Sequence, residues 1–230
     1  MNRRYEGRHV VVTGGLGALG RAVVARLLEE GAVCHVPDLQ APPTVPPWVQ
    51  ADRVFMYGPL DLTAEAQVES LYGSLPSLWA SIHVAGGFHM APLAEIRADT
   101  FRAQLEMNLV SAFLCLREAS KRMTGSGGRM VNVISRPALH PCGGMIGYST
   151  AKAALASLTQ CAAEELRGAG IYVNAIAPSI IDTEANRQAM PNAHHAAWPK
   201  PDELAATIAF LASPENTVTS GALVPVFGRA

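Results

Sequence analysis

The chain has few cysteines, four in 230 residues, and they lie far apart. Cys34, Cys115, Cys142 and Cys161 form neither a CxxC pair nor a cluster with histidine. Metal sites and disulfide frameworks need cysteines at characteristic spacings, so this pattern argues against both. We expect no metal site and four reduced, buried thiols.

Charged residues are also scarce, at 16% of the chain, and the formal net charge is only -1. The lysines and arginines are scattered along the sequence and form no basic run. Nucleic acids and anionic membrane surfaces attract proteins through concentrated positive charge, which is missing here. The sequence therefore predicts no nucleic-acid partner and leaves small neutral or anionic ligands open.

Long apolar runs are missing as well. The basic segment 1–8 leads directly into the apolar segment 9–12, which is too short for the core of a signal peptide. No later segment is long and apolar enough to cross a bilayer. We therefore expect a cytoplasmic protein with no membrane partner.

Apolar residues, 49% of the chain, instead come in short and regular portions. Short β-branched runs alternate with longer amphipathic stretches, which indicates repeated βαβ units and a parallel sheet covered on both faces. We predict one α/β domain over residues 1–230, with a doubly wound parallel sheet of about seven strands flanked by helices. The strands read from the pattern are Val10–Thr13, Val33–Pro37, Ile82–Ala85, Met130–Ile134, Tyr172–Ile176 and Leu223–Val226, and the helices are Ala18–Glu30, Ala64–Tyr72, Thr100–Met123, Ser149–Arg167 and Asp202–Ala212.

One change of composition interrupts this rhythm. The segment 41–48 contains four prolines, which forbid a regular helix. Because it lies between two expected strands of one sheet, we interpret it as a connection in which the crossover helix is shortened or missing, in preference to a partner ligand.

A glycine-rich turn follows the first expected strand. In the segment 13–20, Gly15, Gly17 and Gly20 satisfy GxGxxG, and a helix follows at once. Glycines let the backbone N–H groups and the helix N-terminus approach a pyrophosphate without obstruction by side chains. The pattern predicts a dinucleotide-binding turn, with a plain strand-to-helix connection as the alternative.

An acidic residue stands where such a cofactor would present its adenine ribose. Asp38 ends the second expected strand, and no arginine stands beside it in the segment 38–41. A carboxylate there accepts hydrogen bonds from ribose hydroxyls and repels a 2′-phosphate. We expect NAD(H) to be preferred, without excluding NADP(H); the alternative is a solvated loop aspartate.

Tyr148 and Lys152 form a YxxxK pair on an expected helix. Residues four apart lie on the same face, and a nearby cation lowers the pKa of a phenol. A phenol tuned in this way serves as a general acid/base for alcohol or ketone chemistry. The YxxxK motif is short, so the residues around it decide whether it indicates a catalytic pair.

That context resembles the short-chain dehydrogenase/reductase family over nearly the whole chain. The matching motifs are the glycine-rich turn 13–20, Asn108, Ser135 after the strand 131–134, Tyr148 with Lys152, and the segment 174–178 followed by Thr183. The resemblance implies a Rossmann-type fold, Tyr148 as the acid/base, a hydrogen bond from Ser135 to the substrate oxygen, Lys152 on the nicotinamide ribose and a relay water at Asn108. It also implies that the cofactor meets Gly14, Gly17, Leu19, Gly20, Asp38, Asp61, Leu62, Ala85, Gly86, Tyr148, Lys152, Ile181 and Thr183.

Some positions depart from that family's pattern. Ala18 replaces a glycine of the turn, and its methyl group crowds the pyrophosphate position slightly. His83 and Val84 replace an Asn-Asn pair, and we interpret His83 as a structural residue on a buried strand. Ser179 replaces a glycine, and the end of the chain lacks the usual Asp-Gly-Gly.

A narrower resemblance points to the dihydropteridine reductases. It rests on the segment 144–148, on Asp182–Thr183 with Asn186–Arg187, and on Trp198. Those enzymes have no serine at the position of Ser135, whose hydroxyl suits an oxyanion-like substrate oxygen. We favour hydride transfer to or from a small carbonyl or alcohol, and keep NADH-dependent pterin reduction as the alternative.

The expected substrate lid is short, at about 184–201. Large side chains on and near it suit an apolar pocket for a planar or aromatic molecule. We expect His140 to be a solvent-exposed loop residue in preference to a proton donor. The pocket residues predicted in this way are Phe88, His140, Met145 and Trp198.

Two readings from other classes compete with an enzyme: a non-catalytic NAD-binding sensor or scaffold, and a methyltransferase-like nucleotide binder. Neither needs the full set of Asn108, Ser135, Tyr148 and Lys152. The apolar faces of the helices expected at 100–123 and 149–167 exceed what one sheet must cover, which predicts a homodimer or homotetramer.

Overall fold

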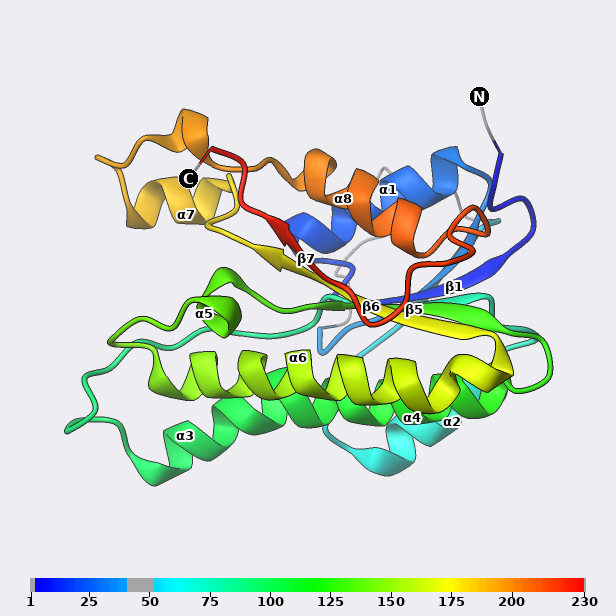
Figure 1. The fold of residues 1–230 in the computed structure, drawn as a ribbon, viewed down its shortest axis with the longest axis horizontal. Coiled ribbons are helices and arrows are strands. Elements are labelled where there is room, and N and C mark those ends of the chain that lie inside the picture. The colour runs from blue at the N-terminus through cyan, green and yellow to red at the C-terminus, as the bar shows by residue number, and fades with distance from the viewer. Residues whose placement is uncertain (1–2, 41–51, 230) are drawn as a thin grey trace.

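The computed structural model describes residues 3–40 and 52–229. Seven parallel strands form one sheet in the order β3-β2-β1-β4-β5-β6-β7, with helices on both faces (Figure 1). The predicted doubly wound α/β sheet is confirmed. The strands are β1 His9–Thr13, β2 Val33–Pro37, β3 Val54–Tyr57, β4 Ala80–His83, β5 Gly128–Val133, β6 Ile171–Pro178 and β7 Leu223–Val226.

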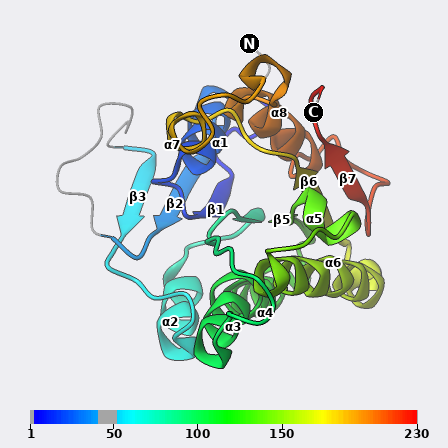
Figure 2. The same ribbon diagram turned by 90° about the vertical axis from the view of Figure 1, so that its left-hand side faces the viewer.

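The helices divide between the two faces of the sheet (Figure 2). Helices α1 and α8 pack together on one face, and α2, α3, α4 and α6 cover the other. Their bounds are α1 Ala18–Glu29, α2 Glu65–Ser74, α3 Ala98–Leu105, α4 Ser111–Met123, α5 Arg136–Leu139, α6 Ile146–Leu166, α7 Glu184–Ala189 and α8 Pro201–Leu211, with a π-helical turn at Glu106–Val110 and 3₁₀ turns at Arg167–Ala169 and His195–Ala197.

Strand β1 shows why helices must cover both faces of the sheet. Val10 and Val12 pack into the cluster under α1 and α8, whereas Val11 packs into the cluster under α2 and α4. All three are fully buried. Alternate residues of a strand point to opposite faces, so an unbroken apolar run fits only a strand buried on both sides.

The structure differs from the expected elements in several places. Strand β3 and helices α5 and α7 were not among the expected elements, and the helix expected at 100–123 is divided by the π-helical turn. Strand β4 ends at His83, two residues earlier than expected. The proline-rich segment 41–48 lies outside the described residues.

The thiols are all free, as expected, but only half of them are buried. Cys34 and Cys115 are buried, whereas Cys142 and Cys161 are exposed, which corrects the expectation of four buried thiols. Within residues 3–40 and 52–229, no group of three His, Cys, Asp or Glu side chains is placed to hold a metal ion. In the same part of the chain, no helix is long and apolar enough to cross a membrane.

The strand order places a functional site. Strands β1 and β4 are neighbours, and the chain runs outward from them in opposite directions along the sheet. Loops that leave the carboxyl ends of such strands diverge and open a crevice for ligands. Here the Oγ1 of Thr13, at the end of β1, accepts from the N–H groups of Val84 and Ala85 after β4, both at 3.1 Å.

Candidate active site

The glycine-rich turn is closely packed on its inner side. Gly14 has a φ of +64°, and a Cβ there would lie 2.9 Å from the backbone of Ala85. A Cβ on Gly20 would collide with the carbonyl of Gly14, so the first turn of α1 lies directly on the loop. Only glycine fits these two positions, and the turn is held in one shape.

The outer side of the turn is open. Gly17 is exposed, and a Cβ there would meet only the carbonyl oxygen of Gly14, at 3.4 Å. Helix α1 has no side-chain cap and no acidic residue in its first turn. The first N–H groups of a helix lack partners within it and attract anions. The residues therefore fit a pyrophosphate, which Gly17 and the start of α1 would hold. Leu19 is buried beneath them and supports the helix.

Asp38 lies at the end of β2, directly beside this turn. Its Oδ2 accepts from the N–H of Leu16 at 3.3 Å, and its Oδ1 accepts from the N–H of Gln40 at 3.1 Å. Both bonds fix the carboxylate at the carboxyl edge of the sheet, where the predicted ribose contact would be made.

Asp61 has a structural task. Its Oδ1 accepts from both the N–H and the hydroxyl of Thr63, at 2.8 and 2.7 Å, which shapes the turn before α2. Leu62 is buried in the cluster beneath α2. The expected adenine contact of these two residues stays a prediction.

Ala85 and Gly86 connect the cofactor crevice to the catalytic residues. A Cβ on Gly86 would lie 2.6 Å from the Oδ1 of Asn108 and 3.3 Å from the Nζ of Lys152. The backbone at Gly86 therefore rests on both side chains. This contact brings the loop after β4 against α6 and the π-helical turn.

Ile181 and Thr183 lie at the start of the lid. The Oγ1 of Thr183 caps α7 by accepting from the N–H of Asn186 at 3.2 Å. The carbonyl of Ile181 accepts from the Nδ2 of Asn186 at 2.8 Å. Both residues therefore hold α7 against the end of β6, and their expected contact with a carboxamide stays a prediction.

Ser135 and Tyr148 face each other at the carboxyl edge of the sheet. The Ser135 hydroxyl is buried and makes no hydrogen bond of normal geometry to the described part of the chain. Burial raises the pKa of Tyr148 above its usual 10.0, and the neighbouring Ser135 hydroxyl lowers it in part. A buried hydroxyl without a partner is costly, and a substrate oxygen placed between the two side chains would satisfy it.

Lys152 is buried on the same face of α6. Its Nζ donates to the carbonyl of Val133 at 2.8 Å and lies 5.9 Å from the centroid of the Tyr148 ring. Burial lowers the pKa of Lys152 to about 8. The net shift of the Tyr148 pKa is upward, because burial is its largest cause. The expectation that Lys152 lowers this pKa stays a prediction.

The side chain of Asn108 is engaged with the backbone. Its Oδ1 accepts from the N–H of Gly87 at 3.1 Å, and its Nδ2 donates to the carbonyls of Gly87 and Gln104 at 2.9 and 3.1 Å. The amide group therefore fixes the loop after β4 to the π-helical turn. The relay water expected at this residue stays a prediction.

Two of the expected pocket residues lie next to Tyr148. The ring of Phe88, 55% exposed, meets the Tyr148 ring edge-on at a centroid distance of 5.0 Å. Met145 is joined to the same loop by a β-bridge to Ala91. His140 is exposed, as expected, with its ring 6.1 Å from that of Phe227.

Trp198 is not open to a pocket. It is only 7% exposed and packs against the ring of His195 at 4.6 Å. The neighbouring carbonyls of Ala197 and Pro199 accept from the N–H groups of Arg229 and Asp182, at 2.8 and 2.9 Å. Trp198 therefore supports the lid from within, because its apolar ring is better buried than exposed on so short a segment.

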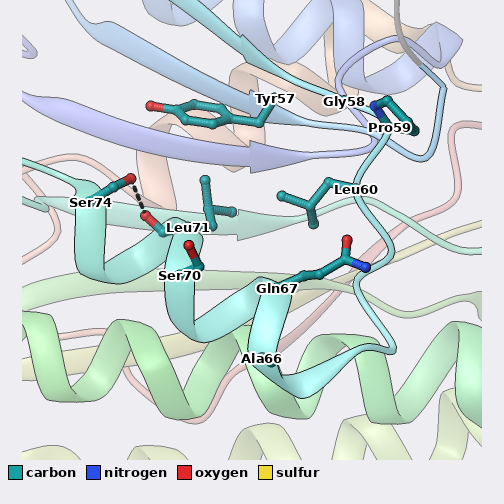
Figure 3. Close-up of a pocket in the computed structure, with 9 residues that line it drawn as sticks. All are labelled: Tyr57, Gly58, Pro59, Leu60, Ala66, Gln67, Ser70, Leu71 and Ser74. Atoms are coloured by element: carbon teal, nitrogen blue, oxygen red, sulfur yellow. Dashed lines mark hydrogen bonds between the residues drawn. The ribbon is translucent and has the colours of Figure 1, made fainter.

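A separate cavity of about 430 Å³ opens between the end of β3 and α2 (Figure 3). Its walls come from residues 57–60 and from one side of α2, with Tyr57, Leu60 and Leu71 facing the space. None of the predicted catalytic residues lines it. The candidate site therefore lies at the sheet edge, where the predicted catalytic residues come together, and not in this cavity.

The role of one residue near the site was missed from the sequence. Thr13 ends β1 and accepts from the N–H groups of Val84 and Ala85, and its place at the end of a strand before the glycine-rich turn is the signal for it.

The chain is similar to known dehydrogenases and reductases. The chain is 32% identical over 99% of its length, and 98% of the relative, to cis-4-hydroxycyclohexanecarboxylate dehydrogenase of Sinomonas cyclohexanicum. It is 29% identical to levodione reductase of Leifsonia aquatica, over 98% of this chain and 94% of that one.

Solved structures agree as well. A dehydrogenase/reductase from Sinorhizobium meliloti 1021 superposes with a TM-score of 0.83 at 26% identity, covering 99% of this chain and 96% of that one. Residues 8–194 match the family of short chain dehydrogenases. The chain is a member of the short-chain dehydrogenase/reductase family of oxidoreductases, which use a nicotinamide dinucleotide.

Proposed function

We propose that this enzyme transfers a hydride between NAD(H) and a small carbonyl or alcohol, with Tyr148 as the general acid/base. The observation that carries the proposal is the buried Ser135 hydroxyl, which faces Tyr148 and makes no hydrogen bond of normal geometry within the described residues. A substrate oxygen between these side chains would accept from both. The bound nicotinamide supplies the hydride in reduction and takes it up in oxidation.

In the direction of reduction, the raised pKa of Tyr148 keeps the phenol protonated and ready to donate. Ser135 polarises the carbonyl by a hydrogen bond that strengthens as negative charge develops on the oxygen. The proton of Tyr148 then completes the alcohol. In oxidation, the same phenol in its ionised form takes the alcohol proton.

Lys152 and Asp38 would bind the two ribose groups. The Nζ of Lys152 donates to the carbonyl of Val133, two residues before Ser135, and has two further N–H donors. The Asp38 carboxylate is held beside the glycine-rich turn. A carboxylate at that place accepts from ribose hydroxyls and repels a phosphate, which supports NAD(H) over NADP(H).

A ring-shaped substrate fits the residues around Tyr148. Phe88 and Met145 provide an apolar surface beside the phenol. The Sinomonas relative is named for a hydroxycyclohexanecarboxylate and the Leifsonia relative for levodione. We propose a small cyclic ketone or the corresponding alcohol. These relatives give no support to pterin reduction. The dihydropteridine reductases have no serine at the position of Ser135, so pterin reduction would leave the Ser135 hydroxyl without a role.

The test compares NADH oxidation with cyclic ketones, quinones and quinonoid dihydropterin, in the wild type and in Tyr148→Phe. We expect ketone reduction in the wild type and its loss in Tyr148→Phe, with NADH binding retained, because the ring remains but the transferable proton is gone. Cys161→Ser, an exposed change on α6, serves as the control. Turnover of the pterin alone would transfer the assignment to pterin reduction. NADH binding without any turnover would favour the sensor or scaffold.

We also propose that the enzyme is a homodimer or homotetramer that pairs through α4 and α6. Phe113 on α4 and Met107 on the preceding π-helical turn are 43% and 42% exposed, which supports an apolar contact there. Light scattering of wild type and Phe113→Glu tests this, with a smaller particle expected for the variant. A cytoplasmic location stays a prediction.

A further inference from the structure

The residues after β7 hold the base of the expected substrate lid. The N–H of Arg229 donates to the carbonyl of Ala197 at 2.8 Å. Gly228 has a φ of +67°, and a Cβ there would lie 2.8 Å from the same carbonyl oxygen and 2.9 Å from the nitrogen of Pro199. Only glycine allows two backbones to approach this closely in that conformation. The lid therefore rests directly on the backbone that follows β7.

The same backbone is anchored to the sheet. The carbonyl of Phe227 accepts from the Ser179 hydroxyl at 2.8 Å, directly after the last paired residues of β6 and β7. The N–H of Asp182 donates to the carbonyl of Pro199 at 2.9 Å, which brings the start and the end of the lid together. Phe227 thus begins a short segment, 227–229, whose backbone joins the sheet to the lid.

The side chain of Phe227 contacts a third element, helix α5. The central guanidinium carbon of Arg136, the first residue of α5, lies 5.1 Å from the centroid of the Phe227 ring. The ring of His140, directly after α5, lies 6.1 Å from it and meets it edge-on, with an interplanar angle of 69°. Cation–π and edge-to-face contacts both depend on where the ring lies. The Phe227 ring therefore contacts both ends of α5.

Helix α5 depends on such contacts for its position. It has only four residues, and none of them is buried. A single helical turn is not stable on its own, so packing against other elements must hold it. Ser135 directly precedes α5 and belongs to the same turn, because its carbonyl accepts from the N–H of Ala138 at 2.9 Å. A shift of α5 would therefore carry Ser135 with it.

We propose that Phe227 is a positioning residue that ties the placement of Ser135 to that of the substrate lid. Its backbone is fixed to the lid and its ring to α5, so these two parts keep one relation while the ring is in place. The Ser135 hydroxyl then faces Tyr148 across the place of a shared substrate oxygen. This role rests on the proposed function, because it serves the hydrogen bond from Ser135 to the reacting oxygen.

The first experiment removes the ring but keeps an apolar side chain. Cyclohexanone reduction by NADH is measured with wild type, Phe227→Leu and Phe227→Tyr, after thermal unfolding and NADH titration have checked folding and cofactor binding. We expect Phe227→Leu to lower kcat roughly three- to thirtyfold, because a misplaced Ser135 gives up part of its transition-state hydrogen bond. Phe227→Tyr keeps the ring and should retain most of the rate. The matched control is Phe210→Leu, an exposed change on α8, which should leave kcat unchanged.

A double variant asks whether Ser135 is the group that Phe227 places. Ser135→Ala removes the hydroxyl, so Phe227→Leu should lower kcat no further in that background. The pH profile of cyclohexanol oxidation is a second readout. Because the Ser135 hydroxyl lowers the pKa of Tyr148, Phe227→Leu should shift the alkaline limb to higher pH. A rate loss that is equal in both backgrounds, an unshifted profile, or a wild-type kcat in Phe227→Leu would overturn the inference.

Hydrogen exchange decides the link between the lid and α5 without turnover. Amide exchange in the segments 136–140 and 195–199 is followed by mass spectrometry in the NADH complex. We expect Phe227→Leu to exchange faster in both segments and Phe210→Leu in neither; faster exchange of one segment alone, or of none, overturns the link. If no ketone is reduced in a Tyr148-dependent way, the proposed function fails, and the exchange still gives a separate answer for Phe227.

Discussion

The Nζ of Lys152 lies 2.8 Å from the carbonyl oxygen of Val133, two residues before Ser135 in the chain. This contact joins α6 to the end of β5 inside the protein, where Lys152 is only 4% exposed. The ammonium is thus a buried cation that donates to a backbone dipole, and its burial has consequences for stability as well as for binding.

Removing this cation should stabilise the protein at neutral pH. The folded-state pKa of Lys152 is about 8, against an ordinary lysine value of 10.5, so the native state disfavours the proton by on the order of 3 kcal/mol. The stability associated with the neutral form is present above pH 10.5 and is lost as the pH falls through 8. We expect Lys152→Met to unfold at a higher temperature than wild type at pH 7, with the difference shrinking between pH 8 and 10.5. Thermal unfolding across this range measures it, and a pH-independent difference would contradict the assignment.

The two directions of the reaction should depend on pH in opposite ways. Because burial raises the pKa of Tyr148, the phenol stays protonated at neutral pH. Reduction needs the protonated form and should hold steady from neutral to mildly alkaline pH, whereas alcohol oxidation needs the ionised form and should increase as the pH rises. Initial rates of both directions at saturating cofactor test this. Oxidation that falls with rising pH would rule out Tyr148 as the base.

Ser135→Ala should slow ketone reduction by roughly ten- to a thousandfold, because a hydrogen bond to the developing oxyanion is lost. It should also shift the alkaline limb of alcohol oxidation to higher pH, since the Ser135 hydroxyl lowers the pKa of Tyr148. Ser149→Ala is a suitable control, because that hydroxyl is also buried without a partner among the described residues but lies outside the predicted site. A slower variant with an unshifted pH profile would leave Ser135 without influence on Tyr148.

Asp38→Ser should reverse the cofactor preference. The carboxylate next to the Leu16 N–H should favour NADH in wild type, and the hydroxyl should weaken NADH and strengthen NADPH. Added salt should narrow the wild-type preference only in part, because a partly buried pair is poorly screened. Fluorescence titration of both cofactors measures this. Equal wild-type affinity for NADH and NADPH would show that Asp38 does not reach the ribose.

Gly86→Ala should reduce activity more than Gly17→Ala does. A methyl group on Gly86 would press on the amide of Asn108 and on the ammonium of Lys152, whereas one on Gly17 meets only a carbonyl at 3.4 Å. We expect Gly86→Ala to lower both NADH affinity and kcat, and Gly17→Ala to weaken NADH and NADPH alike with little effect on kcat. Steady-state kinetics with each cofactor separates the two, and equal losses of kcat would contradict this reading of the loop.

The sequence predicts the buried sheet well, because runs such as 10–13 are apolar on both faces and point to one kind of environment. It misses β3, a four-residue strand after the proline-rich segment, since so short a run gives little periodicity. The helix at 100–123 looks continuous in sequence. The π-helical turn around Asn108 comes with bonds from that side chain to Gly87, which is distant in the chain.

For the candidate site, too, the sequence predicts some features and misses others. Tyr148 and Lys152 are found from their spacing, because i and i+4 share a helix face whatever the rest of the fold does. The upward shift of the Tyr148 pKa is not predicted from the sequence, since it comes mainly from burial, which depends on tertiary contacts. The prediction that Trp198 lines a pocket is wrong for the same reason. A large apolar side chain near a lid is equally suited to line a pocket or to support the lid, and here it is buried.

His83 takes part in a buried chain of hydrogen bonds that crosses from the sheet to α6. Asn132 donates to the Thr159 hydroxyl at 2.8 Å, so its Oδ1 accepts from the Nδ1–H of His83 at 2.7 Å. The other ring nitrogen then accepts from Ser81, which bonds to Tyr72 at 2.7 Å. This order requires a neutral imidazole, in agreement with the pKa of about 4 that burial gives His83.

The Asn132–Thr159 bond ties together the two elements that lead to the predicted catalytic pair. Asn132 lies on β5, three residues before Ser135, and Thr159 follows Tyr148 by eleven residues, about three helical turns, on the same face of α6. The bond therefore fixes α6 against β5 deep in the core, where both partners are fully buried. We expect that a change of one methyl group at this contact alters the distance between the Ser135 and Tyr148 hydroxyls.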